Sequence, residues 1–200
     1  MKKTLLLIAA IACAFGVTAQ DIKLNAPVKT GGEPLMKVFN GRHSERTFVK
    51  KAMPLQMMSD LLWASNGFNR ENKRTVPTAQ DKQELDIYVM TDEGVYLYEA
   101  KAHHLKQVAK GNFKEALGQA NISNNASLSV IIVANLDKAA SREYAYLSAG
   151  YISGHIYLFA ESFGLGTVAR GSFKKIELHK ALKLTDKQEI TLVQPVGFLK

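Results

Sequence analysis

The sequence has a single cysteine, Cys13, and it lies in an apolar N-terminal stretch. A mature chain from which that stretch has been cleaved has no thiol for a disulfide, a thiolate metal site or a covalent sulfur intermediate. Its stability must come from its core, and about 180 residues suffice for one domain with a substantial core. No second domain is needed.

Other absences narrow the chemistry further. No two of the five histidines stand four positions apart, the spacing at which a helix presents a metal-binding pair. No Gly-x-Ser-x-Gly elbow occurs, so a serine hydrolase is not indicated. The basic residues are dispersed and do not alternate with aromatics, so nucleic acid is not an expected partner. The net charge of +8, or 8 − 2 = +6 without Lys2 and Lys3, fits an anionic ligand, an acidic surface or only a soluble exterior.

The N-terminus has the pattern of a secretory signal peptide. Lys2 and Lys3 precede an apolar run that is shorter than the roughly 20 residues of a membrane span, and small residues lead up to Ala19. We expect cleavage after residue 19 and export to the periplasm or beyond, with no membrane segment left. Lipidation at Cys13 is the less favoured alternative, because Ala10 stands where a larger aliphatic residue is usual.

Hydrophobic periodicity predicts an α+β domain over residues 41–200, preceded by an extended lead-in over 20–40. The expected helices are 55–66, one or two short ones within 103–119, 138–164 and 174–184. The expected strands are a hairpin over 85–100, a strand over 128–136 that is buried on both faces, a short one at 167–169 and another at 190–198. Residues 69–84 are polar, contain Pro77 and are expected to form a long loop.

The longest expected helix, 138–164, is apolar on nearly every side. That composition predicts a buried central helix. Its small residues would allow another helix or a ligand to approach the backbone closely, which suggests tight helix packing or a dimer interface. They are Ser148, Ala149, Gly150, Ser153 and Gly154.

The segment 164–169, GLGTVA, formally fits the Gly-x-Gly-x-x-Ala pattern of a dinucleotide-binding turn. That turn needs a strand before its glycines and a helix after them, whereas the predicted order here is the reverse. We therefore interpret Gly164 as the end of a helix.

The segment 40–48, NGRHSERTF, concentrates charge ahead of an apolar turn. Two guanidinium groups, from Arg42 and Arg46, flank the hydroxyl of Ser44 and could hold a phosphate through forked hydrogen bonds. Taken alone, the same residues are more typical of a solvated basic loop.

Four motifs in order change that balance. They are Arg-x-Ser-x-Arg-x-Phe at 42–48, LLWASNGFNRENKRTVPTAQDKQELDIYV at 61–89, ESFGLGTVARGS at 161–172 and LVQPVGF at 192–198. Together they resemble the nitroreductase family of flavin enzymes, and most of all its branch of thiazole- and oxazole-forming dehydrogenases. The resemblance implies an α+β nitroreductase-like fold with a mixed central sheet flanked by helices. It also implies a homodimer with the long helix at the interface and FMN bound between the subunits.

The resemblance also assigns residues to the cofactor. Arg42, Ser44 and Arg46 match positions that hold the FMN phosphate and ribityl chain, and His43 lines the same turn. Three other segments are implied to contact the flavin ring: a loop from the partner subunit, an amide at the pyrimidine edge, and a turn whose backbone N–H points at flavin N5. They correspond, in that order, to Pro77, Thr78 and Ala79, to Gln119, and to Arg170 and Gly171.

The activity implied is hydride transfer through FMN from NAD(P)H or another donor to a small acceptor such as a quinone or nitro compound. Two departures from the family pattern leave an alternative. Asp81 stands where the family often has Asn, and the chain stops at Lys200, where many members continue with basic residues. The alternative is an exported, non-catalytic binding protein of the same fold that holds flavin or another anionic ligand.

Overall fold

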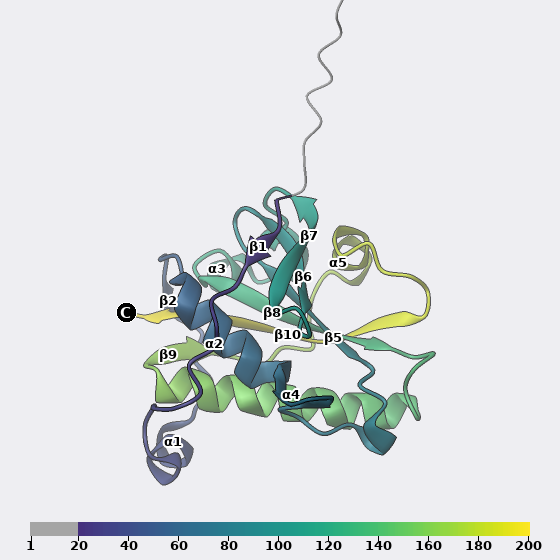
Figure 1. Cartoon of the computed structure of the whole chain (residues 1–200). Helices are drawn as coiled ribbons and strands as arrows, with labels where there is room; N and C mark the ends of the chain where they lie inside the picture. Colours follow the sequence, from purple (N-terminus) through teal and green to yellow (C-terminus); the bar gives the residue numbers. More distant parts are fainter. Residues whose placement is uncertain (1–19) are drawn as a thin grey trace, which may run out of the picture.

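The computed structural model describes residues 20–200. The predicted signal peptide and Cys13 lie outside this part of the chain. A sheet forms the middle of the molecule, with helices against both of its faces (Figure 1). Along the sheet the strands are β1 (Ile22–Lys23), β7 (His104–Lys110), β6 (Gly94–Glu99), β5 (Leu85–Met90), β8 (Leu128–Asn135), β10 (Gln188–Leu199) and β2 (Phe48–Val49), with β9 (Leu165–Thr167) also paired to β10.

The α+β class is as predicted, but every recorded strand pair of this sheet is antiparallel, where a mixed sheet was expected. The helices are α1 (Leu35–Gly41), α2 (Leu55–Asn66), α3 (Ala120–Ser123), α4 (Arg142–Ser162) and α5 (Lys175–Ala181). Two 3₁₀ turns, η1 (Ala79–Asp81) and η2 (Lys114–Leu117), and a separate hairpin of β3 (Phe68–Arg70) and β4 (Lys73–Arg74) complete the described fold.

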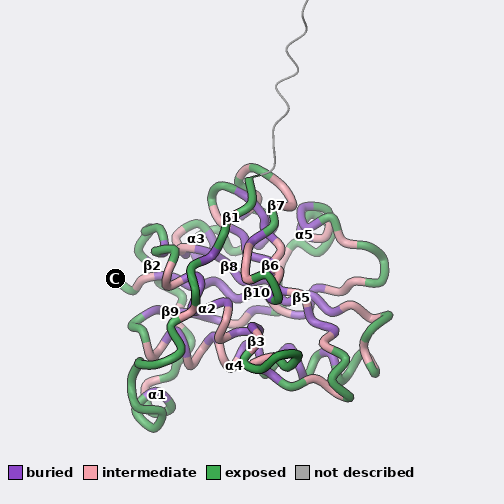
Figure 2. The backbone as a smooth tube through the Cα atoms, viewed as in Figure 1, coloured by how far each residue is buried: buried purple, intermediate pink, exposed green. Residues whose placement is uncertain are grey.

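The central strand β8 confirms the prediction of burial on both faces. Val130 and Ile132 belong to the core beneath α2 and α4, whereas Ile131 and Val133 belong to the core beneath α5. Successive side chains of a strand point to opposite faces, so a continuous apolar run suits a strand covered by helices on both sides. Figure 2 shows this buried interior as a band through the middle of the molecule.

Helix α2 also forms where the sequence predicts it. It begins after Pro54 and ends at Gly67, whose backbone N–H donates to the Trp63 carbonyl at 2.8 Å. Leu61 and Leu62 are fully buried in the core shared with α4.

Helix α4 begins at a serine cap, because the Ser141 side chain accepts the Tyr144 backbone N–H at 3.2 Å. Gly164 follows the helix with a φ of +66°, and β9 comes next, so the order is helix, glycine, strand, as predicted. The expectation of burial on nearly every side was wrong for the single chain. One face of α4 packs on the sheet, whereas Tyr144, Leu147 and Tyr151 are exposed.

Three local predictions were wrong. Residues 35–41 form α1 instead of continuing the extended lead-in, and part of the expected loop 69–84 forms the β3–β4 hairpin. Within 103–119, where short helices were expected, β7 pairs with β6 and only the 3₁₀ turn η2 follows. Side chains of β7 such as Leu105, which is fully buried, gain more from packing on the sheet than their helix propensity offers. The break at Gly111, with a φ of +116°, lies where it was expected.

Among residues 20–200, no helix combines the length and apolar character that crossing a membrane would require.

Candidate functional site

The segment 42–46 follows α1 and lies against β9 and α4. The Glu45 backbone N–H donates to the Thr167 carbonyl at 2.9 Å. The Ser44 hydroxyl lies 2.8 Å from the hydroxyl of Tyr157 on α4. The Tyr157 hydroxyl also accepts the Ala169 backbone N–H at 2.9 Å, so its own hydrogen is available to Ser44. Tyr157 therefore joins the predicted phosphate segment to the turn that carries Arg170.

The charged side chains of this segment remain accessible. Arg42 and Arg46 are exposed, and the Arg42 guanidinium lies 5.1 Å from the centre of the Tyr157 ring, a cation–π contact. The Glu45 carboxylate accepts the backbone N–H groups of Arg46 at 2.6 Å and Thr47 at 2.7 Å. These hydrogen bonds, that of Thr47 first, lower the pKa of Glu45 below its usual value.

His43 is turned back toward the end of α1. Its Nδ1 lies 2.8 Å from the Gly41 carbonyl, which fixes Nδ1 as the donor. The Glu45 and Glu161 carboxylates both stand 3.9 Å from its ring nitrogens. The His43 ring therefore lies in the same segment as the two arginines, but the side chains near it are the carboxylates of Glu45 and Glu161.

The turn at 169–172 meets the segment at 117–119. The backbone N–H of Arg170 donates to the Val193 carbonyl at 2.8 Å, so this N–H is occupied. Gly171 is exposed, and its N–H donates to no acceptor among the described residues. The Gln119 side-chain amide donates to the Ser172 hydroxyl at 3.1 Å. Of the pair predicted to face flavin N5, Gly171 has the available donor.

The C-terminus lies beside the same segment. Leu199 of β10 pairs with Phe48 of β2, so Lys200 follows directly next to the end of segment 42–46. A Cβ added at Gly166 would come within 2.6 Å of the Leu199 side chain and 2.9 Å of the Glu45 side chain. Only a glycine at position 166 lets these three segments approach so closely.

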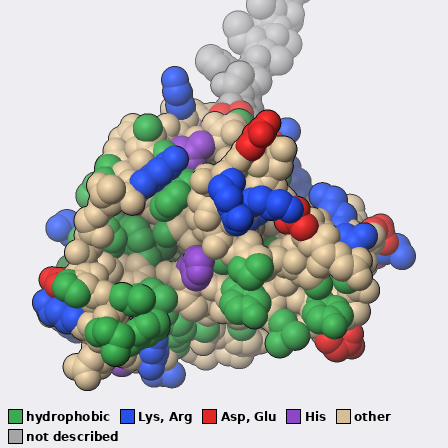
Figure 3. Space-filling view, turned by 60° about the horizontal axis from the view of Figure 1, so that its bottom comes forward, with side chains coloured by type: hydrophobic (Ala, Val, Ile, Leu, Met, Phe, Trp, Pro, Cys, Tyr) green, Lys and Arg blue, Asp and Glu red, His purple; other side chains and the backbone are tan. Residues whose placement is uncertain are grey.

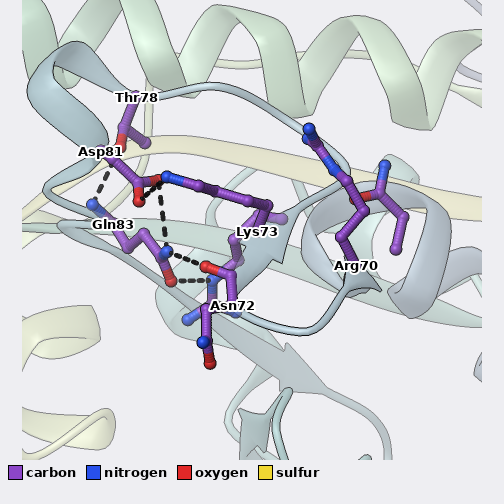
Figure 4. A network of polar contacts seen from close by, with 8 residues as sticks. Arg70, Asn72, Lys73, Thr78, Asp81 and Gln83 are labelled. Atoms are coloured by element: carbon purple, nitrogen blue, oxygen red, sulfur yellow. Dashed lines mark hydrogen bonds and ion pairs between the residues drawn. The ribbon is translucent and has the colours of Figure 1, made fainter.

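Pro77, Thr78 and Ala79 lie elsewhere on the chain, in the loop that contains η1. Figure 4 shows Lys73, Asp81 and Gln83 turned toward one another, with Arg70 pointing away. The Asp81 carboxylate contacts the Lys73 ammonium at 2.5 Å and the Gln83 amide at 3.3 Å.

This network also sets the charge and the shape of the loop. The Lys73 and Gln83 hydrogen bonds lower the pKa of Asp81, so its negative charge is retained but paired. Gln80, Asp81 and Gln83 all have a positive φ, a strained backbone that the surrounding contacts must maintain.

The structure thus gathers most of the predicted cofactor residues on one side of the chain. Segment 42–46, the turn 169–172 and Gln119 are linked in series through Tyr157 and Ser172. These donors fit FMN: accessible guanidinium groups and a hydroxyl suit a phosphate, and the Gly171 N–H and the Gln119 amide suit the polar edge of a flavin. Among residues 20–200, no hydrogen bond joins the loop 77–79 to these segments.

Sequence reasoning missed several residues that build this site. Tyr157 stands in an apolar helix, and in the sequence only its hydroxyl distinguishes it from a core residue. Glu45 lies inside the segment, but the sequence pattern indicates only its arginines, its histidine and its serine. Lys73, which pairs with Asp81, stands eight positions away in a stretch expected to be loop, and only the hairpin brings the two together.

No group of three or more His, Cys, Asp or Glu residues in the described part of the chain could hold a metal ion.

The comparisons with known proteins point to one family. Residues 40–198 match the model of the nitroreductase family. A Methanocaldococcus jannaschii protein described as a nitroreductase is 30% identical over 173 residues, which cover 78% of this chain and 86% of that protein.

Two solved structures are similar over nearly the whole chain. One, described as a nitroreductase from Ralstonia eutropha JMP134, is 30% identical with a TM-score of 0.84, covering 99% of this chain and 96% of that one. The other belongs to the Escherichia coli microcin synthetase complex. It is 14% identical with a TM-score of 0.70 over 98% of this chain and 85% of that one, so it is similar in fold alone.

Proposed function

The chain belongs to the nitroreductase family, and from that premise we propose that it is an exported, FMN-dependent oxidoreductase that works as a homodimer. Family membership makes it a nitroreductase-like oxidoreductase of a flavin-dependent kind. The cofactor, the subunit arrangement, the export and the branch of thiazole- and oxazole-forming dehydrogenases are the proposed parts.

One observation carries the FMN assignment. The Ser44 hydroxyl, the Tyr157 hydroxyl and the Ala169 N–H form one chain of hydrogen bonds. A phosphate at Arg42, Ser44 and Arg46 and a ring at Gly171 would thus be held by segments in direct contact. A single elongated cofactor that contacts several segments requires those segments to keep fixed positions relative to one another.

When bound, FMN would supply two-electron redox chemistry between NAD(P)H or another donor and a small acceptor such as a quinone or nitro compound. The protein would bind and orient the cofactor. Guanidinium groups would neutralise the phosphate, and the Gly171 N–H and the Gln119 amide would fix the ring. No side-chain acid or base is needed.

The apolar face formed by α1 and α4 supports the homodimer. Figure 3 shows hydrophobic side chains gathered on the side of the molecule that lies at the bottom of Figure 1, where these two helices run. Exposed apolar residues on one surface mark an interaction site. They are Leu35 (58% exposed), Met36 (76%), Phe39 (53%), Tyr144 (53%), Leu147 (63%) and Tyr151 (55%).

Small residues on α4 also suit close contact with a second helix. A Cβ at Gly150 or Gly154 would meet nothing within 4 Å, so this part of the helix is open within one chain. In the proposed dimer, the loop with Pro77, Thr78 and Ala79 would reach the flavin bound to the partner, which explains why it lies apart from the other cofactor residues.

The decisive experiment uses the chain from residue 20 onward, purified and mixed with FMN and then with NADH or NADPH without oxygen. We expect a yellow dimer whose flavin absorbance is bleached by one of the donors. A dimer that binds FMN but is bleached by no donor would favour the binding-protein alternative, and one that binds no FMN would refute the proposal.

The phosphate assignment has its own test. Arg42→Ala combined with Ser44→Ala should release FMN while the domain stays folded, because it removes two of the three side-chain donors. Lys187→Ala is the control, since it also removes one exposed cation but lies at the end of β10 opposite segment 42–46. Unchanged FMN affinity in the double variant would refute the assignment.

Export is tested by expressing the full chain in a bacterium and assaying cytoplasmic and periplasmic fractions.

A further inference from the structure

The side chain of Arg170 is buried inside the candidate site, although only its backbone was expected to matter. The residue is 6% exposed, and no carboxylate among the described residues lies within ion-pair distance of its guanidinium. Burial lowers the pKa of this guanidinium from its usual value, with no neighbouring anion to oppose the effect. A buried cation without a counter-ion is costly, so its hydrogen bonds must offset the lost solvation.

The Arg170 guanidinium contacts the two segments that are predicted to face the flavin ring. One terminal nitrogen donates to the Leu117 carbonyl at 2.7 Å and to the Ser172 carbonyl at 3.1 Å. The other donates to the Ser123 hydroxyl at 3.0 Å, which in turn donates to the Gly118 carbonyl at 2.7 Å. One side chain therefore holds peptide groups on both sides of the site.

The peptide groups held in this way are those that set the position of Gln119. Gly118 has a φ of +65° and Gln119 a φ of +47°, so the chain passes through two left-handed residues, the second of which is not a glycine. Such a conformation persists only where the surroundings enforce it. The guanidinium fixes the carbonyls of Leu117 and, through Ser123, of Gly118, which are the two carbonyls that precede Gln119.

The same side chain stabilises the turn that contains Gly171. The backbone of Arg170 is fixed by its paired hydrogen bonds with Val193, and the Ser172 carbonyl is fixed by the Arg170 guanidinium. Gly171 thus lies between two anchored residues. The Nε of Arg170 is buried and has no hydrogen-bond partner among the described residues, so the side chain is held here at a cost in solvation.

We infer that Arg170 is a positioning residue, whose guanidinium holds the Gln119 amide and the Gly171 N–H in the relative arrangement that binds the flavin ring. This inference rests on the proposed function. A lysine could not replace it, because the acceptors surround two separate terminal nitrogens of the guanidinium and an ammonium has only one nitrogen.

The test compares FMN binding by Arg170→Lys, Arg170→Ala and the unchanged chain from residue 20 onward, each confirmed to be folded by far-ultraviolet circular dichroism. FMN affinity is measured by fluorescence titration, and the ring environment by visible circular dichroism of the bound flavin. We expect Arg170→Lys to weaken FMN binding about tenfold or more and to change the visible spectrum, because buried carbonyls lose their donors.

Chemical rescue separates this role from a general loss of stability. Guanidinium ion at millimolar concentration should restore FMN affinity to Arg170→Ala, whereas ammonium at the same ionic strength should not. Wild-type FMN affinity and spectrum in a folded Arg170→Lys variant would overturn the inference.

If neither Arg170 variant folds, Ser123→Ala takes their place, since it cuts the link to the Gly118 carbonyl and leaves the arginine intact. Weakened FMN binding by folded Ser123→Ala would support the inference, and wild-type binding would overturn it. Failure of the unchanged protein to bind FMN would refute the proposed function instead, so the two failures are distinguishable.

Discussion

The hydroxyl of Tyr157 lies 2.8 Å from the hydroxyl of Ser44 and accepts the Ala169 N–H at 2.9 Å, so one side chain of α4 couples two segments far apart in sequence. If the proposed cofactor spans these segments, the coupling contributes to its binding. Tyr157→Phe keeps the ring beneath Arg42 but removes the hydroxyl. We expect FMN affinity to fall about threefold to tenfold, the equivalent of roughly one hydrogen bond.

Fluorescence titration of FMN measures this loss, and urea unfolding reports any change in stability. The control is Tyr96→Phe, which removes a hydroxyl from β6, outside the candidate site, where it accepts from the Gln107 amide at 3.4 Å. Equal FMN affinity in the Tyr157→Phe and unchanged proteins would show that the coupling does not contribute to binding.

A charge on the exposed apolar face of α4 should prevent dimerisation. Leu147→Glu places a carboxylate where the proposed interface would bury it, at a cost of several kcal/mol, enough to weaken association at least a hundredfold. Size-exclusion chromatography with light scattering should give a monomer. FMN binding should fall as well, because the loop 77–79 of the partner would no longer reach the site.

Ile176→Glu is the matched control, since Ile176 is 81% exposed on α5, away from this face. It should remain a dimer with FMN affinity unchanged. A dimeric Leu147→Glu protein would argue that α4 is not at the interface.

The elements predicted correctly are those whose signal is local. The apolar run of β8 and the proline and glycine around α2 determine structure within a few residues of themselves. The segment 103–110 was misassigned because its Leu, Lys, Gln and Ala residues favour a helix locally, and only pairing with β6 makes it a strand. The sequence predicts a helix α4 that is buried on nearly every side, because its exposed tyrosines and leucine cannot be distinguished in the sequence from its buried residues.

The same contrast between local signals and long-range contacts applies to the candidate site. The arginines and serine of segment 42–46 stand close together in the sequence and could be selected from it. The links that organise the site are Tyr157 to Ala169, Arg170 to Leu117 and Lys73 to Asp81, and the first two depend on contacts across the sheet and helices that no spacing encodes.

The pairing of Asp81 with Lys73 predicts how the loop after Pro77 would tolerate a carboxylate beside the proposed cofactor, which becomes more electron-rich on reduction. Lys73→Met leaves Asp81 unpaired and should weaken FMN binding roughly twofold to fivefold, the range of an exposed ion pair. Asp81→Asn should cost less, because asparagine adopts the positive φ of this position readily.

The double variant, Lys73→Met with Asp81→Asn, should recover most of the lost affinity, since the unpaired charge is then gone. FMN titration of the four proteins forms a double-mutant cycle. Purely additive effects would mean that the ion pair does not influence the site.

The ion pair between Arg142 and Glu189 predicts a specific dependence of stability on pH. The Arg142 guanidinium donates to both oxygens of Glu189, at 2.9 Å and 2.8 Å, and lowers the pKa of Glu189 to about 2. In the unfolded chain this pKa returns to about 4.5. The folded value is the lower one, so the contribution to stability is complete above pH 4.5 and is lost as the pH falls toward 2.

Urea unfolding from pH 7 to pH 2 should therefore show that Glu189→Gln is less stable than the unchanged protein by a constant margin down to about pH 5. Below that, the margin should shrink, because protonation weakens the pair in the unchanged protein while glutamine does not titrate. Glu71→Gln, at an exposed position, is the control and should show no such convergence. A margin that stays constant down to pH 2 would mean that the carboxylate of Glu189 is not stabilised by Arg142, and that the side chain contributes through packing alone.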